Sequence, residues 1–130
     1  MTKRSVLMLG LVCLSTATAH ADKLTCTGTE PFWQLTIDDN NILLQDGNKV
    51  TGQSKMTLKS VKPRPAAGAP PGAVQVYEAT TSGRNGAAMT IVLQKREESK
   101  CSNGMSDPIY PYDVIVVTPR VVFMGCCANK

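Results

Sequence analysis

Short segments in which apolar and polar residues alternate recur along most of this chain. Between positions 33 and 38, Trp33, Leu35 and Ile37 alternate with polar residues, which is the pattern of a strand that buries one face. The same criterion predicts further strands in residues 41–45, 49–51, 56–58, 74–78, 89–93, 112–118 and 121–126. No segment has the apolar period of an amphipathic helix. The pattern therefore predicts an all-β protein.

Turn signals separate these predicted strands. Asp46-Gly47 and Asn85-Gly86 have the composition of hairpin turns, and residues 118–120 contain a proline between two strands. Residues 63–72 are rich in Pro, Gly and Ala and predict a long surface loop. About eight short strands joined in this way favour a small antiparallel barrel or sandwich, formed by one domain over residues 22–130.

The first 21 residues predict an export signal rather than a part of the fold. Lys3 and Arg4 precede an apolar run at positions 6–14, and an A-x-A sequence ends at Ala21. These are the three parts of a cleavable signal peptide, whereas a stable membrane span needs about 20 apolar residues. We therefore expect a periplasmic or secreted protein with no transmembrane segment in the mature chain. Lipid anchoring at Cys13 is the less favoured alternative, because Val12 precedes it.

The charge of the chain argues against nucleic acid as a partner. The formal net charge is +4, and removal of Lys3 and Arg4 with the leader lowers it to +2. Basic side chains do not form a stripe with interleaved aromatics, which is typical of nucleic-acid binding. The expected partner is instead an envelope protein or a small ligand.

Four cysteines remain after the leader: Cys26, Cys101, Cys126 and Cys127. An even number in an exported domain predicts disulfides, whereas a zinc site would need C-x-x-C pairs or histidines, and His20 lies in the leader. Neighbouring Cα atoms are ~3.8 Å apart, below the usual ~4.4 Å minimum for a disulfide, so Cys126 and Cys127 should have different partners. The prediction is Cys101–Cys126 and Cys26–Cys127, with no metal and no cofactor.

The sequence offers little that could catalyse a reaction. The carboxylates that could form a catalytic pair lie before a turn, in a charged run or in a loop, where solvated surface is the ordinary interpretation: Asp38, Asp39, Glu97, Glu98 and Asp107. No histidine remains to act as a general base, and all four thiols can pair. We therefore expect no enzymatic activity.

Two segments are richer in composition than surface loops require. Residues 28–33 combine a glycine, a carboxylate, a proline and two aromatics, and residues 101–111 combine turn signals with Met105, Ile109 and Tyr110. The hypothesis is that the two lie side by side and form a binding surface made of Glu30, Phe32, Trp33, Met105, Ser106, Asp107 and Tyr110. In the competing interpretation Trp33 anchors the core, and residues 101–111 are a passive loop closed by a disulfide.

The same segments carry a resemblance to a known family. E-P-F-W at 30–33, C-S-x-G-M-S-D at 101–107, Tyr110-Pro111 and Gly125-Cys126 resemble a family of uncharacterised bacterial exported proteins and putative lipoproteins. Members often have one cysteine in the C-S-x-G-M-S-D segment and one in the terminal Gly-Cys, so Cys26 and Cys127 form an added pair here. The resemblance implies an envelope location and no particular activity.

The size and layout of the chain are also similar to the small β-barrel inhibitors of c-type lysozyme. Those inhibitors present an S-A-S-G-A-x-Y loop, which residues 81–84 match in Ser82-Gly83, with Arg84 as a basic neighbour. Three hypotheses follow: a non-catalytic binding module of the envelope, a lysozyme inhibitor that inserts a loop into the enzyme's cleft, and a structural envelope component.

Overall fold

A computed structural model describes residues 22–82, 86–97, 101–102 and 110–130. Within these residues the chain is all β, with nine strands in the order β1 (Leu24–Thr29), β2 (Phe32–Asp38), β3 (Asn41–Asp46), β4 (Lys55–Ser60), β5 (Arg64–Pro65), β6 (Val74–Thr80), β7 (Ala88–Lys95), β8 (Tyr112–Val117) and β9 (Val122–Asn129). Among the described residues, no helix is long and apolar enough to cross a membrane.

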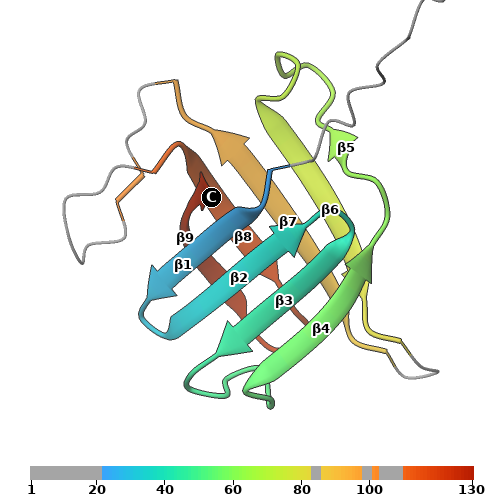
Figure 1. Ribbon diagram of the computed structural model, residues 1–130, viewed down its shortest axis with the longest axis vertical. Coiled ribbons are helices and arrows are strands. Elements are labelled where there is room, and N and C mark those ends of the chain that lie inside the picture. Colours follow the sequence, from blue (N-terminus) through green and yellow to red (C-terminus); the bar gives the residue numbers. More distant parts are fainter. Residues whose placement is uncertain (1–21, 83–85, 98–100, 103–109) are drawn as a thin grey trace, which may run out of the picture.

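Eight of the strands close into an antiparallel barrel (Figure 1). β1 to β4 pair in sequence order, and so do β6 to β9. Pairing of β1 with β9, and of the end of β4 with the end of β6, joins the two halves. β5 pairs with the other part of the same edge of β6. The prediction of a small antiparallel barrel or sandwich is therefore confirmed, and the barrel is the form observed.

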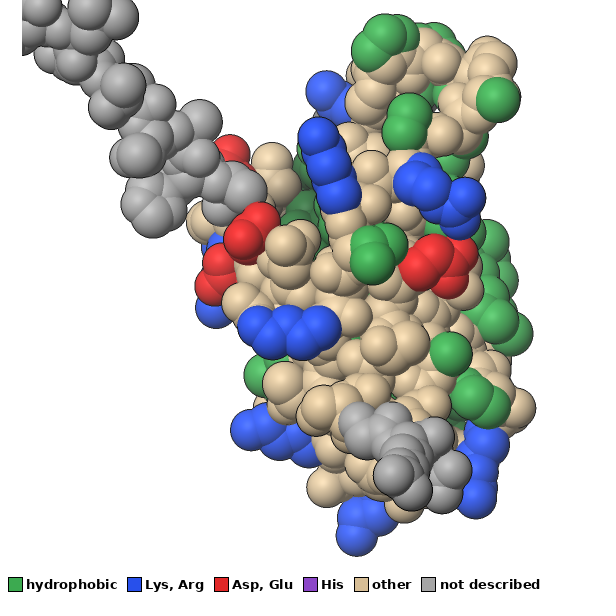
Figure 2. Space-filling model, turned by 90° about the vertical axis from the view of Figure 1, so that its right-hand side faces the viewer, with side chains coloured by type: hydrophobic (Ala, Val, Ile, Leu, Met, Phe, Trp, Pro, Cys, Tyr) green, Lys and Arg blue, Asp and Glu red, His purple; other side chains and the backbone are tan. Residues whose placement is uncertain are grey.

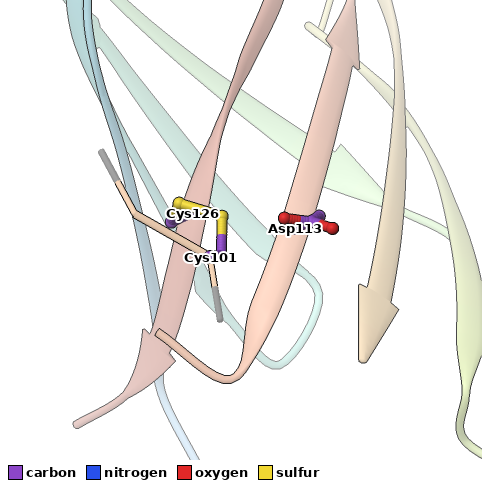
Figure 3. Close-up of side chains that lie close together, drawn as sticks. All are labelled: Cys101, Asp113 and Cys126. Atoms are coloured by element: carbon purple, nitrogen blue, oxygen red, sulfur yellow. A yellow bond between two sulfur atoms is a disulfide. The ribbon is translucent and has the colours of Figure 1, made fainter. Parts of the chain in front are cut away.

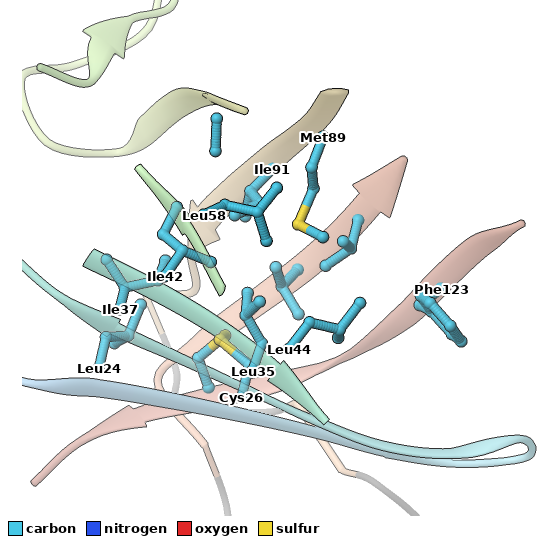
Figure 4. Packing of buried hydrophobic residues seen from close by; sticks show 14 of the residues in the cluster. Leu24, Cys26, Leu35, Ile37, Ile42, Leu44, Leu58, Met89, Ile91 and Phe123 are labelled. Carbon is cyan, nitrogen blue, oxygen red and sulfur yellow. A yellow bond between two sulfur atoms is a disulfide. The ribbon is translucent and has the colours of Figure 1, made fainter. Parts of the chain in front are cut away.

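Alternating side chains from every long strand fill the interior of the barrel (Figure 4). An eight-stranded barrel is just wide enough for side chains to fill it. Trp33 has 1% of its surface exposed, and its ring centroid is 5.4 Å from that of Phe123. Its placement in the binding surface is therefore corrected, and the competing interpretation as a core anchor holds. Gly28 and Gly125 lie against the indole, so close that a Cβ at either position would overlap it.

Both predicted disulfides are present, and the barrel separates them. Cys26 and Cys127 are cross-strand partners on the inner face of β1 and β9, with a Cα–Cα distance of 3.9 Å. Cys126 faces the outside because neighbouring residues of a strand point to opposite faces, and it is bonded to Cys101. One disulfide thus joins the first and last strands, and the other fixes residue 101 to the outer surface.

The structure corrects the prediction of a strand at residues 49–51. The carboxylate of Asp46 is buried and accepts hydrogen bonds from the backbone N–H groups of Asn48 (3.2 Å) and Thr51 (2.8 Å) and from the Thr51 hydroxyl (2.9 Å). These bonds wrap residues 47–54 around Asp46 as a loop, and β4 begins at Lys55. The sequence pattern also missed β1, in which threonines and a glycine weaken the alternation.

Two predicted connections also differ from expectation. Residues 63–72 are not wholly a loop, because Arg64 and Pro65 form β5 opposite Val76 and Gln75. The β6–β7 connection is wider than a two-residue hairpin, since the Thr81 N–H donates to the Ala87 carbonyl (3.0 Å). Asn85, on which the predicted turn rested, lies outside the described residues.

Candidate functional site

A hollow of about 310 Å³ lies on the outer surface at the end of β1. Its lining comes from the end of β1 (Gly28 and Thr29), from Glu30 in the β1–β2 turn, from β8 and β9, and from Cys101 and Ser102. Of residues 101–111, the described residues Cys101 and Ser102 line the hollow together with Glu30. We call it the cystine hollow, because the Cys101–Cys126 disulfide forms part of its wall.

The Cys101–Cys126 disulfide fixes residue 101 against β9, and backbone hydrogen bonds join Tyr110 to Cys101. Cys101 and Tyr110 exchange two backbone hydrogen bonds, Cys101 N to Tyr110 O (3.3 Å) and Tyr110 N to Cys101 O (3.0 Å). Both ends of the connecting segment are thus held next to β9. Tyr110 itself is half-buried. Met105, Ser106 and Asp107, predicted as site residues, lie outside the described residues.

Glu30 is the predicted site residue that the structure places at the rim of the cystine hollow. Its side chain is exposed, and it precedes Pro31 through a cis peptide bond. Phe32 and Trp33 do not line this hollow. Phe32 is 53% exposed and packs against Gly47 in the β3–β4 loop, whereas the Trp33 indole lies inside the barrel behind Gly28 and Gly125.

Asp113 and Met124 also line the cystine hollow, and the sequence reasoning did not select either of them. Asp113 forms an ion pair with Arg96. Met124 is 73% exposed on the outer face of β9. The sequence nevertheless contained a signal for Met124. Residues 114–117 and 121–124 are apolar at consecutive positions, and such a run predicts a strand that is apolar on both faces.

Met124 belongs to a larger apolar surface on the outside of the barrel. Ile115 pairs with Met124 across β8 and β9, and Val117 pairs with Val122. All four side chains are exposed, although their neighbours in the same strands fill the core. We call these four residues the apolar stripe; it is continuous with the cystine hollow through Met124.

The sulfur atoms of Cys101 and Cys126 and a carboxylate oxygen of Asp113 lie within 4.8 Å of one another (Figure 3). Three such atoms are close enough to coordinate one metal ion, but the thiolate is the form of cysteine that binds metals. Both sulfurs are in a disulfide, and Asp113 is paired with Arg96. In this oxidised state the group offers the side chain of Asp113 for polar contacts and does not make a metal centre.

The carboxylates considered as catalytic candidates are described only in part. Asp38, Asp39 and Glu97 are all exposed, and Glu98 and Asp107 lie outside the described residues. Of the residues proposed for a lysozyme-binding loop, Ser82 is exposed in the β6–β7 connection, and Gly83 and Arg84 lie outside the described residues.

Comparison with known proteins gives no match to a family model, to a curated protein or to a solved structure. The family inferred from the E-P-F-W and C-S-x-G-M-S-D motifs therefore stays a prediction.

Proposed function

We propose that this protein is a non-catalytic binding module of the bacterial envelope, periplasmic or secreted, that recognises a protein partner through the apolar stripe and the cystine hollow. The observation that carries the proposal is the outward-facing pairing of Ile115 with Met124 and of Val117 with Val122. The interior of the barrel is already filled from other positions. Apolar side chains gathered on the outside of a small domain mark an interaction surface.

The cystine hollow gives this surface a polar edge. The exposed carboxylate of Glu30 lies at its rim, and Asp113 lies beside Met124. A partner with apolar side chains and one basic side chain at their border would match both parts. The Cys101–Cys126 disulfide restricts the wall of the hollow before binding, which lowers the conformational entropy that a partner must remove.

The test compares capture of envelope proteins by the wild-type protein and by two matched variants. Met124→Glu places a charge in the apolar stripe, and Thr57→Glu places the same charge at an exposed position of β4. We expect Met124→Glu to reduce recovery of a specific partner at least tenfold, while Thr57→Glu keeps it and both variants melt normally. Equal recovery by the two variants would refute the proposed surface.

A purified c-type lysozyme serves as a defined bait in the same experiment. Binding that is insensitive to Met124→Glu but is lost on Ser82→Ala with Arg84→Ala would replace the proposal with the inhibitor hypothesis. If no envelope protein depends on either surface, and cells lacking the protein have a weakened envelope, the structural hypothesis would replace it.

A further inference from the structure

A second hollow, of about 400 Å³, lies at the other end of β1 and is separate from the cystine hollow. Leu24, Ile37 and Pro63 give it apolar walls, and Asp22, Asp39 and Lys62 bring charged groups to it. Figure 2 shows acidic side chains on one side of a hollow with apolar atoms at its bottom and a Lys or Arg side chain on the other. The ends of small β-barrels are common places for small-molecule sites.

Polar side chains face the interior of the barrel near this hollow. Tyr77 lines it and pairs with the buried Ile91, and Gln75 pairs with the buried Leu93. Because cross-strand partners point to the same face, both polar residues are directed inward. The Tyr77 hydroxyl donates to Gln75 Oε1 (3.2 Å). Burial, and secondarily the nearby Tyr112, raise the pKa of Tyr77.

Ser60 adds a buried polar group without a partner. It is 8% exposed on the inner face of β4, and its hydroxyl has no hydrogen-bond partner in the described part of the chain. Its backbone N–H donates to the carbonyl of Asn40 (2.9 Å), and Asn40 lines the hollow. Its cross-strand partner is the small residue Ala79. Ser60 thus lies next to a residue that lines the hollow, and it is not itself part of the lining.

The backbone of Asp39 is held in a conformation that few residues adopt. Its φ is +54° in the tight turn between β2 and β3, a region that is uncommon for residues other than glycine, with Asn and Asp tolerated best. The turn fixes the carboxylate of Asp39 at the hollow. A two-residue hairpin turn requires this conformation, and Asp is among the residues that it favours.

From these observations we propose that the hollow beside Asp39 and Tyr77 is a binding site for a small amphipathic amine. The apolar part of the ligand lies against Leu24 and Ile37, and its ammonium group lies at the carboxylate of Asp39. This site is separate from the surface proposed for the protein partner, and either proposal can fail alone.

Two fluorescent probes of opposite charge test the ligand class. The dansyl amide of cadaverine ends in an ammonium group, and the dansyl amide of aminohexanoic acid has the same chromophore and a similar chain but ends in a carboxylate. We expect saturable binding of the cationic probe, at least tenfold tighter than that of the anionic probe. Equal or tighter binding of the anionic probe, or no saturable binding of either, would overturn the proposal.

Matched variants test whether the cationic probe binds in the hollow beside Asp39 and Tyr77. Asp39→Asn removes one charge and keeps a residue that tolerates positive φ, so the turn should still form; we expect about tenfold weaker binding of the cationic probe. Asp38→Asn makes the same charge change at the neighbouring exposed position, which does not line the hollow, and should leave binding unchanged. Tyr77→Phe should weaken binding several-fold. Equal effects of the two Asp variants would refute the site.

Backbone amide NMR shifts distinguish this site from the surface proposed for the protein partner. The cationic probe should shift the signals of Asp39, Lys62 and Tyr77 and leave those of Glu30 and Met124 in place. Shifts confined to Glu30 and Met124 would show that the amine binds at the cystine hollow instead.

Discussion

At the scale of single residues, two glycines determine how closely the indole of Trp33 packs against the barrel wall. A Cβ at Gly28 would lie 2.1 Å from Trp33 Nε1, whereas a Cβ at Gly125 would lie 2.2 Å from the Thr27 carbonyl oxygen. The closest overlap is thus with a side chain at Gly28 and with backbone at Gly125, where the indole Cζ2 also lies 2.7 Å away. The two glycines therefore differ in what a substitution would have to displace.

We expect Gly28→Ala and Gly125→Ala each to lower the free energy of unfolding by about 2–3 kcal/mol through overpacking. In a Trp33→Phe background the cost of Gly28→Ala should fall by at least about 1 kcal/mol, because residues in contact are not additive. The cost of Gly125→Ala should fall by less, since its closest overlap, with the Thr27 carbonyl, remains. Urea unfolding of the single and double variants measures these differences; an equal cost of Gly28→Ala in both backgrounds would contradict the packing described.

Tyr77 predicts a loss of stability at alkaline pH. Burial disfavours its charged form and raises its pKa above the usual 10.0, so the unfolded chain releases the phenolic proton at a lower pH than the folded chain. The stability that this difference provides is fully present below pH 10 and is lost as the pH rises through the folded-state pKa.

Urea unfolding of the wild-type protein and of Tyr77→Phe between pH 8 and pH 11 tests this prediction. The wild-type protein should lose more stability than the variant above about pH 10, where phenols ionise. Parallel curves would show that the phenol is not shielded from water in the folded protein.

Among individual residues, the sequence was most informative where a residue type has few structural solutions. Adjacent Cys126 and Cys127 could not pair with each other, and the assignment that followed is confirmed. The buried carboxylate of Asp46 could not be foreseen, because Asp-Gly is also the composition of a simple hairpin turn. Its burial depends on donors from a loop that forms only in the folded chain.

At the scale of elements, alternation predicted strands where large apolar residues marked the inner face. Residues 33–38 and 89–93 are such cases, and both are strands. β1 was missed because its inner positions include Cys26 and Gly28, which give little apolar contrast. The glycine is there because the indole of Trp33 occupies the space of its side chain. A long-range contact thus removed the local signal.

The candidate site also depends on long-range structure that a single segment of sequence does not contain. The C-S-x-G-M-S-D and E-P-F-W segments drew attention to Glu30 and to residues 101–111, and the structure brings Glu30 and Cys101 to one hollow. Asp113 and Met124 were missed because they come from the outer faces of β8 and β9. Which face of a strand is outside follows from the closure of the barrel, and no single segment contains that information.

Across the barrel as a whole, the two disulfides differ in location and in the length of the loop that each one closes. Cys26–Cys127 lies in the core and joins strands that are 101 residues apart in sequence, whereas Cys101–Cys126 lies on the outside and spans 25 residues. Loop-closure entropy gives about 4.7 kcal/mol for the first and about 3.5 kcal/mol for the second. Both removals should therefore destabilise the protein, the inner one more.

Removal of the two disulfides should affect partner capture in the opposite order to stability. Loss of Cys101–Cys126 should weaken capture more than loss of Cys26–Cys127. Cys101→Ala with Cys126→Ala frees the wall of the cystine hollow but leaves the residues around Trp33 in place, so the near-ultraviolet circular dichroism should persist while partner capture falls at least tenfold. Cys26→Ala with Cys127→Ala weakens the barrel but leaves the hollow formed, so capture measured well below its melting temperature should stay close to that of the wild-type protein. Because the less stable variant is the one expected to bind, a general loss of folding cannot produce this result. Full capture by the Cys101→Ala, Cys126→Ala variant would show that the partner does not use the cystine hollow.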